Sequence, residues 1–590
     1  MGRLILALVA VLSGAITVSA SHSASYYHPD IKSAHDNAFA IFNSIHSAMR
    51  QWGSSVHHNG LSFYLATAPE GSVFYHGGYR TERPDSFEWL AFEIEHAAQF
   101  AASWEFTQSA DLNTMADTAL DAQILKTLLR HRSSHARPPS NPARSPNLHN
   151  KLSSQRPLGT VQNNDEGDED DDDDDEDPPT RPPRFDKLRR GYLQLYRANR
   201  PLNLLYIDGE AAAKCSLGSL DSQDLILLGR NKSSGPPTWG EWPRAKQLCA
   251  LADEWKHPTG AKIDGFIRME AGFEIIYCDF SEQGGLDLVS VQGSSFRNET
   301  GLPPHQIDSV FEWLRASAAR FHGHPAGRLD IDWSSMVSAF SYPMNLSNPD
   351  WHRQDLPRVV NATMESRLGV RSRLRDVFAA RGGQEVPKRK AVNWQGVVDK
   401  IVTRFSERLQ YIAINQWTHD RLLLALGTIV DPHISYTDHS PMSEHLAIDR
   451  CTQHYLDPSF LHPETWTPED HAIATALERV SHTICDTLFH ARRVLRAANG
   501  MMSSDSDAFV KEAQRIIVEL MEQLRWSTWR ECDRCASPDE ICSIPMFPTG
   551  ASEDDYFYPS CKNITEILRS FAYWGLDVQE SLIKPIRKDI

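Results

Sequence analysis

The sequence predicts an α+β N-terminal domain, with mixed or antiparallel strands, followed by a mainly α-helical C-terminal domain. Short runs rich in β-branched and aromatic residues recur between residues 62 and 291, separated by turn residues. After residue 303, apolar residues instead recur near a 3.6-residue period over long segments. At 590 residues the chain is also too long for one hydrophobic core, so more than one domain is expected.

Residues 1–20 have the pattern of a signal peptide. Arg3 gives a positive start, Leu4 to Leu12 is apolar, and the small residues Val18-Ser19-Ala20 offer a cleavage point. No later run approaches the roughly 20 apolar residues that a membrane helix needs. We therefore expect a secreted, extracellular protein without a membrane span.

The α+β domain is expected over residues 30–295. Helical patterns cover Ile31–Trp52 and Glu88–Phe106. Predicted strands lie at residues 62–66, 72–76, 191–196, 202–207, 273–279 and 286–291.

An insertion interrupts this domain at residues 130–185. It is first rich in Pro and Arg and then acidic, with twelve acids between Asp165 and Asp177. Few apolar residues and dense like charge predict disorder. The acidic run also accounts for most of the net charge of −17. No basic stretch interleaved with aromatic residues indicates nucleic-acid binding.

The α-helical domain is expected over residues 303–530. Its clearest helix begins with Thr467 as N-cap and Pro468 at the first helical position, and Gly500 is expected to follow its end. Further helices are predicted at residues 394–416, 506–526 and 563–574.

The C-terminal segment, residues 531–590, is rich in cysteine. In an oxidising compartment its four cysteines predict two disulfides, whereas a cytosolic protein would more often use them for zinc. The pairing cannot be read from the spacing, and nine cysteines in the chain leave an odd one. These four candidates are Cys532, Cys535, Cys542 and Cys561.

Five sequons predict N-linked glycans once a signal peptide is assumed. They begin at Asn231, Asn298, Asn345, Asn361 and Asn563. An extracellular protein partner is compatible with such a surface, and no particular partner is indicated.

Common catalytic signatures are absent from the sequence. There is no G-x-S-x-G, phosphate-binding P-loop, G-x-G-x-x-G or H-E-x-x-H motif. A stretch rich in histidine and acidic residues, 419–449, contains ligand types of a hydrolytic metal site, but its spacing fits no recognised metal scaffold. A surface loop is the alternative interpretation.

The stretch SVFYHGG, residues 72–78, is the best candidate for a site. His76 ends an apolar strand and precedes two glycines, which allow a ligand to approach the backbone closely. Glu274 opens a later apolar strand, Phe273–Tyr277. A histidine in an ordinary turn is the alternative interpretation of His76.

The order of these residues resembles the ADP-ribosyltransferase fold. The resemblance rests on Tyr75-His76-Gly77, on the aromatic Trp89, and on Glu274. It implies NAD as a substrate, with Tyr75, Gly77 and Trp89 binding the nicotinamide end, and His76 and Glu274 in the catalytic positions. It also implies that His76 and Glu274 share one cleft. The sequence departs from that family at Gly78, and in having Trp89 or Phe92 where a tyrosine is usual.

A broader resemblance covers most of the chain. Residues 87–97, 204–209 with 224–227, 342–350 and 526–529 are similar to an uncharacterised family of large secreted proteins of filamentous fungi. Three functions therefore stay open: a secreted glycoprotein with an ADP-ribosyltransferase-like domain, a non-enzymatic secreted binding protein, and a metal-dependent hydrolase.

Overall fold

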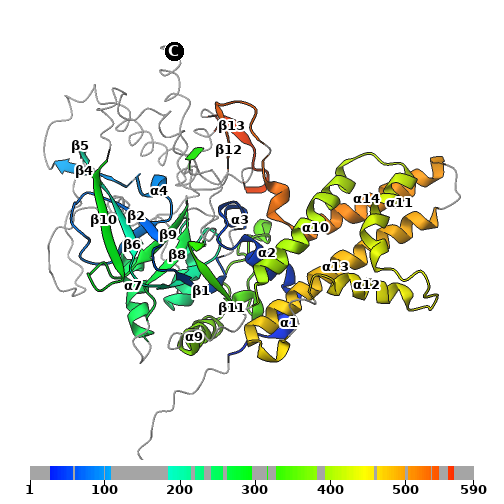
Figure 1. The fold of residues 1–590 in the computed structure, drawn as a ribbon, viewed down its shortest axis with the longest axis horizontal. Coiled ribbons are helices and arrows are strands. Elements are labelled where there is room, and N and C mark those ends of the chain that lie inside the picture. Colours follow the sequence, from blue (N-terminus) through cyan, green and yellow to red (C-terminus); the bar gives the residue numbers. More distant parts are fainter. Residues whose placement is uncertain are drawn as a thin grey trace, which may run out of the picture.

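A curled nine-stranded sheet forms the N-terminal half of the molecule, and a mainly helical region projects from it (Figure 1). The computed structural model describes residues 27–57, 60–98, 100–107, 184–213, 219–231, 241–256, 262–270, 272–294, 315–316, 327–381, 392–456, 462–498, 503–532, 534–543, 556–563 and 566. The predicted signal peptide and the predicted insertion, up to residue 183, lie outside these residues. The predicted fold class is confirmed.

The strand order of the large sheet is β10-β6-β2-β3-β9-β8-β7-β1-β11. All neighbouring strands run antiparallel except β7 and β8, which are parallel. The strands are β1 (Ser62–Ala68), β2 (Val73–Gly78), β3 (Glu88–Ala91), β6 (Tyr192–Ala198), β7 (Leu202–Ile207), β8 (Gly265–Met269), β9 (Phe273–Tyr277), β10 (Leu286–Gly293) and β11 (Asp330–Ser338).

Six of these strands were predicted from the sequence, and they are confirmed with small shifts of their ends. The helix predicted over Glu88–Phe106 is wrong. That stretch forms β3, the short helix α4 (Ile94–Ala98) and β4 (Ala102–Thr107). All four residues of β3 are buried, so the segment shows no strand alternation in its sequence.

The helix predicted over Ile31–Trp52 is divided in three: α1 (Ile31–Asp36), α2 (Ala38–Ser47) and α3 (Gln51–Val56). Asn37 caps the end of α1, and its side chain donates to the carbonyls of Ser33 and Phe340. Met49 has a φ of 54°, which ends the helical path after α2.

Helical elements cover the sheet from several parts of the sequence. The short helix α6 (Leu220–Ser222) continues as a π-helix, η2 (Gln223–Leu227), and α7 (Glu241–Glu254) packs beside it and beside β8. A further helix, α9 (Met364–Arg381), contacts η2 and β11. Strand β4 pairs separately with β5 (Arg184–Arg190).

The projecting region is built around α13 (Pro468–Ala497), which contacts the helices around it (Figure 1). Thr467 caps α13 and forms a capping box with Asp470, and Pro468 is the first helical residue, as predicted. Gly500 lies outside the described residues. The other helices here are α10 (Trp394–Ile414), α11 (His419–Val430), α12 (Ser443–Gln453) and α14 (Ser503–Leu524).

The two halves of the sequence share elements. Strand β11 comes from the range predicted as helical, 303–530, and it forms one edge of the large sheet beside β1. Conversely, α1 and α2 come from the first half and pack against α13.

Four disulfides join cysteines of the described residues: Cys249–Cys278, Cys451–Cys485, Cys532–Cys542 and Cys535–Cys561. The two predicted disulfides of the C-terminal segment are therefore confirmed. They link the segment after η10 (Ser527–Arg530) to the small hairpin of β12 (Glu540–Cys542) and β13 (Cys561–Asn563). Cys215 lies outside the described residues.

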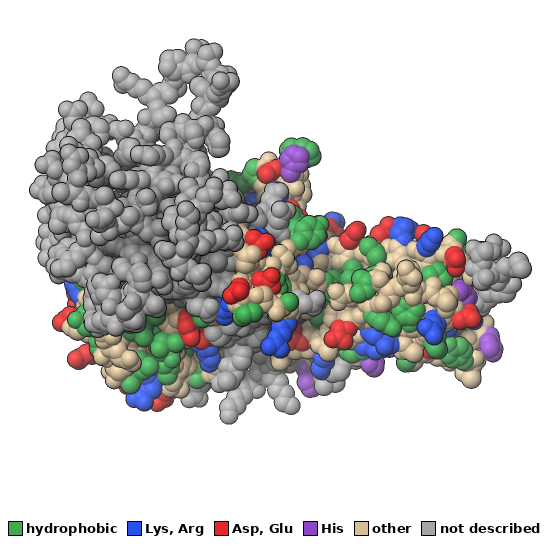
Figure 2. Space-filling view, turned by 90° about the horizontal axis from the view of Figure 1, so that it is seen from above, with side chains coloured by type: hydrophobic (Ala, Val, Ile, Leu, Met, Phe, Trp, Pro, Cys, Tyr) green, Lys and Arg blue, Asp and Glu red, His purple; other side chains and the backbone are tan. Residues whose placement is uncertain are grey.

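Acidic and basic side chains are interspersed over the described surface seen from above in Figure 2. Within the described part of the chain, no helix combines the length and the apolar character that crossing a membrane requires.

Candidate functional site

A pocket lies beside the ends of β2 and β3. The two strands pair at Tyr75 and Ala91, and the chain between Gly78 and Glu88 then loops away from the sheet. The pocket has a volume of about 60 Å³, enough for a few waters or one small polar group. Its walls include His76, Gly78, Arg80, Glu88, Gln194 and Trp242.

His76 is a buried, neutral histidine of this pocket. Its Nδ1 lies 2.9 Å from the carbonyl oxygen of Trp89 and must donate, because a carbonyl can only accept. Burial lowers the pKa of His76 to about 4, so the ring is uncharged near neutral pH. The neutral ring then has its other nitrogen, Nε2, as a hydrogen-bond acceptor.

Gly78 makes room for that acceptor. A Cβ at position 78 would lie 2.9 Å from His76 Nε2, closer than real Cβ contacts are. Gly77 has a different role, since a Cβ there would meet the Ala97 carbonyl oxygen at 2.0 Å. Gly77 therefore allows close backbone packing against the end of α4, whereas Gly78 borders the pocket.

Glu88 is the carboxyl group of the pocket. It is the first residue of β3, and its side chain is buried. Burial raises the pKa of Glu88 to about 8, so its protonated form predominates at pH 7. Its Oε2 has no hydrogen-bond partner among the described residues. A protonated carboxyl both donates and accepts, which suits a neutral polar ligand.

The loop that forms the rim is held by side chains of the sheet. Gln194 Nε2 donates to the carbonyls of Arg80 and Glu82, at 3.0 and 2.9 Å. Tyr196 donates in turn to Gln194 Oε1. Arg83 Nη1 donates to three carbonyls beyond β9, including that of Leu286 at 3.0 Å. These contacts give the pocket a fixed shape before any ligand arrives.

An aromatic group forms one wall. Trp242, near the start of α7, lies 4.5 Å from Phe87 and 5.7 Å from Trp89 between ring centroids. On the rim, Arg80 lies 3.5 Å from the Asp85 carboxylate, so these two exposed charges offset each other. Glu82 adds one further carboxylate to the lining, so the pocket is polar, aromatic on one side and without an excess of positive charge.

The sheet register separates His76 from Glu274. Tyr75 lies opposite Ala91, and Ala91 lies opposite Glu274. Because directly opposite residues share a face and successive residues alternate, Tyr75 and Glu274 project from one face and His76 from the other. The structure therefore does not bring His76 and Glu274 into one cleft. Use of NAD at these residues stays a prediction.

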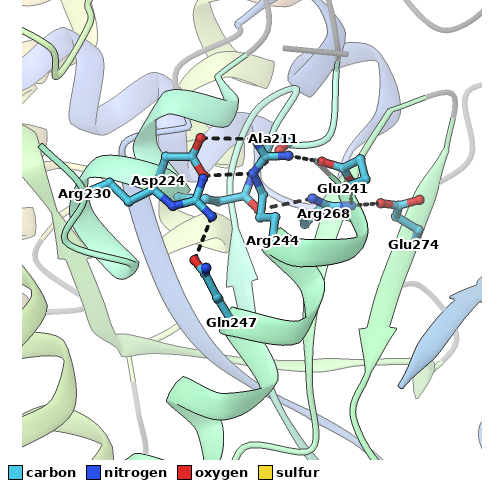
Figure 3. Close-up of polar contacts among 9 residues, drawn as sticks. Ala211, Asp224, Arg230, Glu241, Arg244, Gln247, Arg268 and Glu274 are labelled. Atoms are coloured by element: carbon cyan, nitrogen blue, oxygen red, sulfur yellow. Dashed lines mark hydrogen bonds and ion pairs between the residues drawn. The ribbon is translucent and has the colours of Figure 1, made fainter. Parts of the chain in front are cut away.

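Glu274 instead belongs to a buried ion network (Figure 3). Arg268 is fully buried, and its Nη2 lies 2.6 Å from Glu274 and 2.7 Å from Glu241. Arg244 contacts the same Glu241 and both carboxylate oxygens of Asp224, at 2.9 and 3.0 Å. The buried acids are thus compensated by buried arginines, which makes their burial tolerable.

The side chains of the histidine and acid-rich stretch 419–449 do not gather around one point, as a metal site would require. His419 bonds to Asp420 and to the Leu495 carbonyl, while Asp431 and Glu444 pair with arginines of α13. Across the described residues, no group of three His, Cys, Asp or Glu side chains is arranged to hold a metal ion.

The predicted glycosylation positions lie in different settings. Asn231, Asn345 and Asn361 are exposed, whereas Asn563 in β13 is half-buried and Asn298 lies outside the described residues. Their modification stays a prediction.

Sequence reasoning found His76 and the glycines but missed the carboxyl beside them. The helical pattern over Glu88–Phe106 places Glu88 in a first helical turn, and no sequence pattern marks Trp242 or Gln194 as pocket residues. A Glu that opens a fully apolar tripeptide, Trp89-Leu90-Ala91, is the signal that identifies Glu88 as a buried acid.

Comparison with known proteins places these features in a wider group. Residues 24–313 match the family model described as the YPL277C N-terminal domain. This half of the chain is similar to an uncharacterised fungal family. The pocket and the ion network both lie within the range that the YPL277C N-terminal domain covers.

Two relatives come from Saccharomyces cerevisiae (strain ATCC 204508 / S288c), and both are described as uncharacterised. YOR389W is 26% identical over 88% of this chain and 83% of its own length. YPL277C is 33% identical over 47% of each chain. These relatives are fungal, although they come from a yeast and not from a filamentous fungus. Neither is described as an ADP-ribosyltransferase, and no solved structure matches the chain.

Proposed function

We propose that this protein is a secreted binding protein whose sheet holds a site for a small neutral group that carries hydroxyls, such as one sugar residue of an extracellular glycan. The observation that supports this is the pairing of an uncharged histidine and an uncharged carboxyl in one pocket. His76 offers an acceptor at Nε2, and Glu88 offers a donor and an acceptor.

The charges of the pocket favour a neutral ligand over an anion. Phosphate groups are usually bound by arginine, lysine or helix N-termini. Here the rim arginine, Arg80, lies beside Asp85, and the two buried titratable groups are neutral at pH 7. Hydroxyl groups match this set of donors and acceptors without a cost for burying charge.

The size and the aromatic wall fit the same class of ligand. A volume of about 60 Å³ admits one substituent, such as a hydroxymethyl group, while the rest of the ligand stays at the rim. Trp242 is half-buried beside Phe87 and Trp89, and aromatic rings supply apolar area with little side-chain entropy to lose.

Secretion is supported by the signal-peptide pattern at residues 1–20 and by the four disulfides, which persist in oxidising compartments. The glycan sequons are compatible with the same route. Detection of the cleaved chain in culture medium, with a mass reduced by glycosidase treatment, tests both statements.

The binding proposal is tested by ligand-observed NMR on the purified chain. Methyl glycosides of glucose, galactose, mannose and N-acetylglucosamine are compared with a sugar phosphate and with NAD. We expect saturation transfer to at least one neutral glycoside, lost in Glu88→Leu and Trp242→Ala and retained in Glu88→Gln. Trp351→Ala is the control, because Trp351 is 75% exposed and lies outside the pocket.

Two results would contradict the proposal. One is glycoside binding that Glu88→Leu and Trp242→Ala leave unchanged. The other is turnover of NAD that is lost in Glu274→Gln, which would support the ADP-ribosyltransferase hypothesis instead.

A further inference from the structure

The aromatic wall of the pocket belongs to a helix whose first turn is held by buried charges. Trp242 is the second residue of α7, and Glu241 is the first. Trp242 itself lines the pocket and packs against Phe87 and Trp89, while the buried Glu241 side chain contacts the network drawn in Figure 3. Adjacent residues thus connect the pocket to the ion network.

Glu241 is a bridge between two arginines. Its Oε2 lies 2.7 Å from Arg268 Nη2, and its Oε1 contacts Arg244 Nη1. Arg244 lies one turn further along α7 and binds Asp224 of the π-helix η2. The start of α7 is therefore fixed to β8 and to η2 at once.

Glu274 shares the same nitrogen of Arg268 with Glu241. Residues 268 and 274 lie directly opposite each other on β8 and β9, and Glu274 Oε1 lies 2.6 Å from Arg268 Nη2. That nitrogen therefore donates to both Glu241 and Glu274. Arg268 Nη1 reaches Gln223 at a longer 3.2 Å, and Arg268 Nε has no hydrogen-bond partner among the described residues.

The orientation of the Arg268 guanidinium thus depends on both carboxylates. If the charge of Glu274 is removed, the remaining charged partner of Nη2 is Glu241, and the guanidinium turns toward it. Glu241 and Trp242 are consecutive residues in the first turn of α7, so this turn is the part of the helix to which a change at the Arg268–Glu241 contact is passed. The aromatic ring is the part of that turn that faces the pocket.

From these contacts we infer that Arg268 and Glu274 are positioning residues. Their ion pair also includes Glu241, and through Glu241 it determines the position of the Trp242 side chain and hence the shape of the pocket. This role extends the proposed function and rests on it only for the identity of the ligand. It gives Glu274 a role on the opposite face of the sheet from His76, without contact with a ligand.

Fluorine NMR tests the position of Trp242 directly. The full chain is labelled with 5-fluorotryptophan, and the Trp242 signal among those of the 15 tryptophans is the one missing in Trp242→Phe. In Glu274→Gln we expect this signal to shift by more than its linewidth. Glu241→Asp, which keeps the charge but shortens the bridge, should shift it as well and serves if Glu274→Gln does not fold.

Glu469→Gln is the matched control. Arg373 contacts Glu469 through two bonds of 2.7 and 2.9 Å, and Glu469 is buried like Glu274, at 1% against 5% exposed, but this pair joins α9 to α13. The Glu469→Gln replacement should lower the melting temperature without shifting the Trp242 fluorine signal. An unmoved Trp242 signal in both Glu274→Gln and Glu241→Asp, with a similar fall in melting temperature, would overturn the inference, because the network would then only stabilise the fold.

Binding of the methyl glycosides is measured on the same samples. We expect affinity to fall about tenfold or more in Glu274→Gln and to stay unchanged in Glu469→Gln. If no glycoside binds the unaltered protein, the proposed function fails, whereas a shifted Trp242 signal still supports the positioning role. Unchanged affinity in a Glu274→Gln protein that binds glycosides would contradict the effect on pocket shape.

Discussion

At the scale of single residues, burial has opposite effects on the two titratable groups of the pocket, and both become neutral. The pKa of His76 falls to about 4 and that of Glu88 rises to about 8. Both shifts have desolvation as their largest cause, because a buried site disfavours whichever form is charged. Burial in the same pocket therefore leaves the His76 imidazole as an acceptor and the Glu88 carboxyl as a donor between these two pH values.

The raised pKa of Glu88 makes stability depend on pH. Between its ordinary value of 4.5 and its folded value of about 8, the folded state holds a proton that the unfolded state releases. Stability therefore falls as pH rises through this window. In Glu88→Gln this loss should be absent. Above pH 8 the free energy of unfolding of the variant should therefore exceed that of the unaltered protein by up to about 5 kcal/mol.

Urea unfolding between about pH 4 and pH 9 measures this difference. The two proteins should be nearly equal in stability near pH 4, where Glu88 is protonated in both states. Parallel stability curves across the whole range would show that Glu88 keeps an ordinary pKa.

Residue types identified the pocket only in part. The two glycines after His76 indicated a close approach, and the structure shows that one of them, Gly78, makes room for the imidazole while the other packs against backbone. Glu88 and Glu274 each open an apolar run in the sequence, so composition could not rank them. The pairing register of the sheet separates them: Glu88 faces the pocket, and Glu274 faces Arg268.

At the scale of elements, strands with clear turn residues were predictable and a fully buried strand was not. The six predicted strands match the structure because turn residues bound them and β-branched or aromatic side chains fill them. Strand β3 is buried on both faces, so its sequence lacks alternation. The sequence also could not show that Met49 has a positive φ, which separates α2 from α3.

The disulfide Cys451–Cys485 joins α12 to α13, and both cysteines are buried. It spans 34 residues, so replacing both cysteines by alanine should lower the free energy of unfolding by about 3–4 kcal/mol through a larger unfolded-state entropy. Urea unfolding without reductant measures the effect.

A pair of replacements at Cys532–Cys542 provides the comparison, because that disulfide spans only 10 residues and neither cysteine is fully buried. Its loss should cost less. Equal losses at the two disulfides would contradict the dependence on loop length and burial.

At the scale of the whole molecule, the two predicted domains depend on each other. Arg50 before α3 forms two bonds with Asp399 of α10, at 2.8 and 2.6 Å. Gln395 donates to the Ile45 and Ala48 carbonyls, and Trp52 donates to the Ser527 carbonyl. The first helices of the chain are thus part of the helical region. Conversely, β11, from the second half of the sequence, forms one edge of the large sheet.

A fragment covering residues 27–300 should therefore not fold alone. It lacks β11, which pairs with β1, and the helices that bury α2. We expect it to bind a hydrophobic dye and to lose its near-ultraviolet circular dichroism while keeping secondary structure. Co-expression with residues 301–590 should restore the near-ultraviolet signal of the intact chain. Cooperative unfolding of the lone fragment, at the temperature of the intact chain, would contradict this dependence.

The pairing of β1 with β11 also sets an order of events on the ribosome. Ser62 and Ser338, which share a hydrogen bond between these strands, are 276 residues apart. At typical elongation rates the nascent chain carries β1 without its outer neighbour for roughly 15–55 s. Throughout that interval one edge of β1 remains open to other unfinished chains. Crowded synthesis and a slowed ribosome should therefore lower the yield of this protein more than that of a protein whose edge strands are made next to their partners.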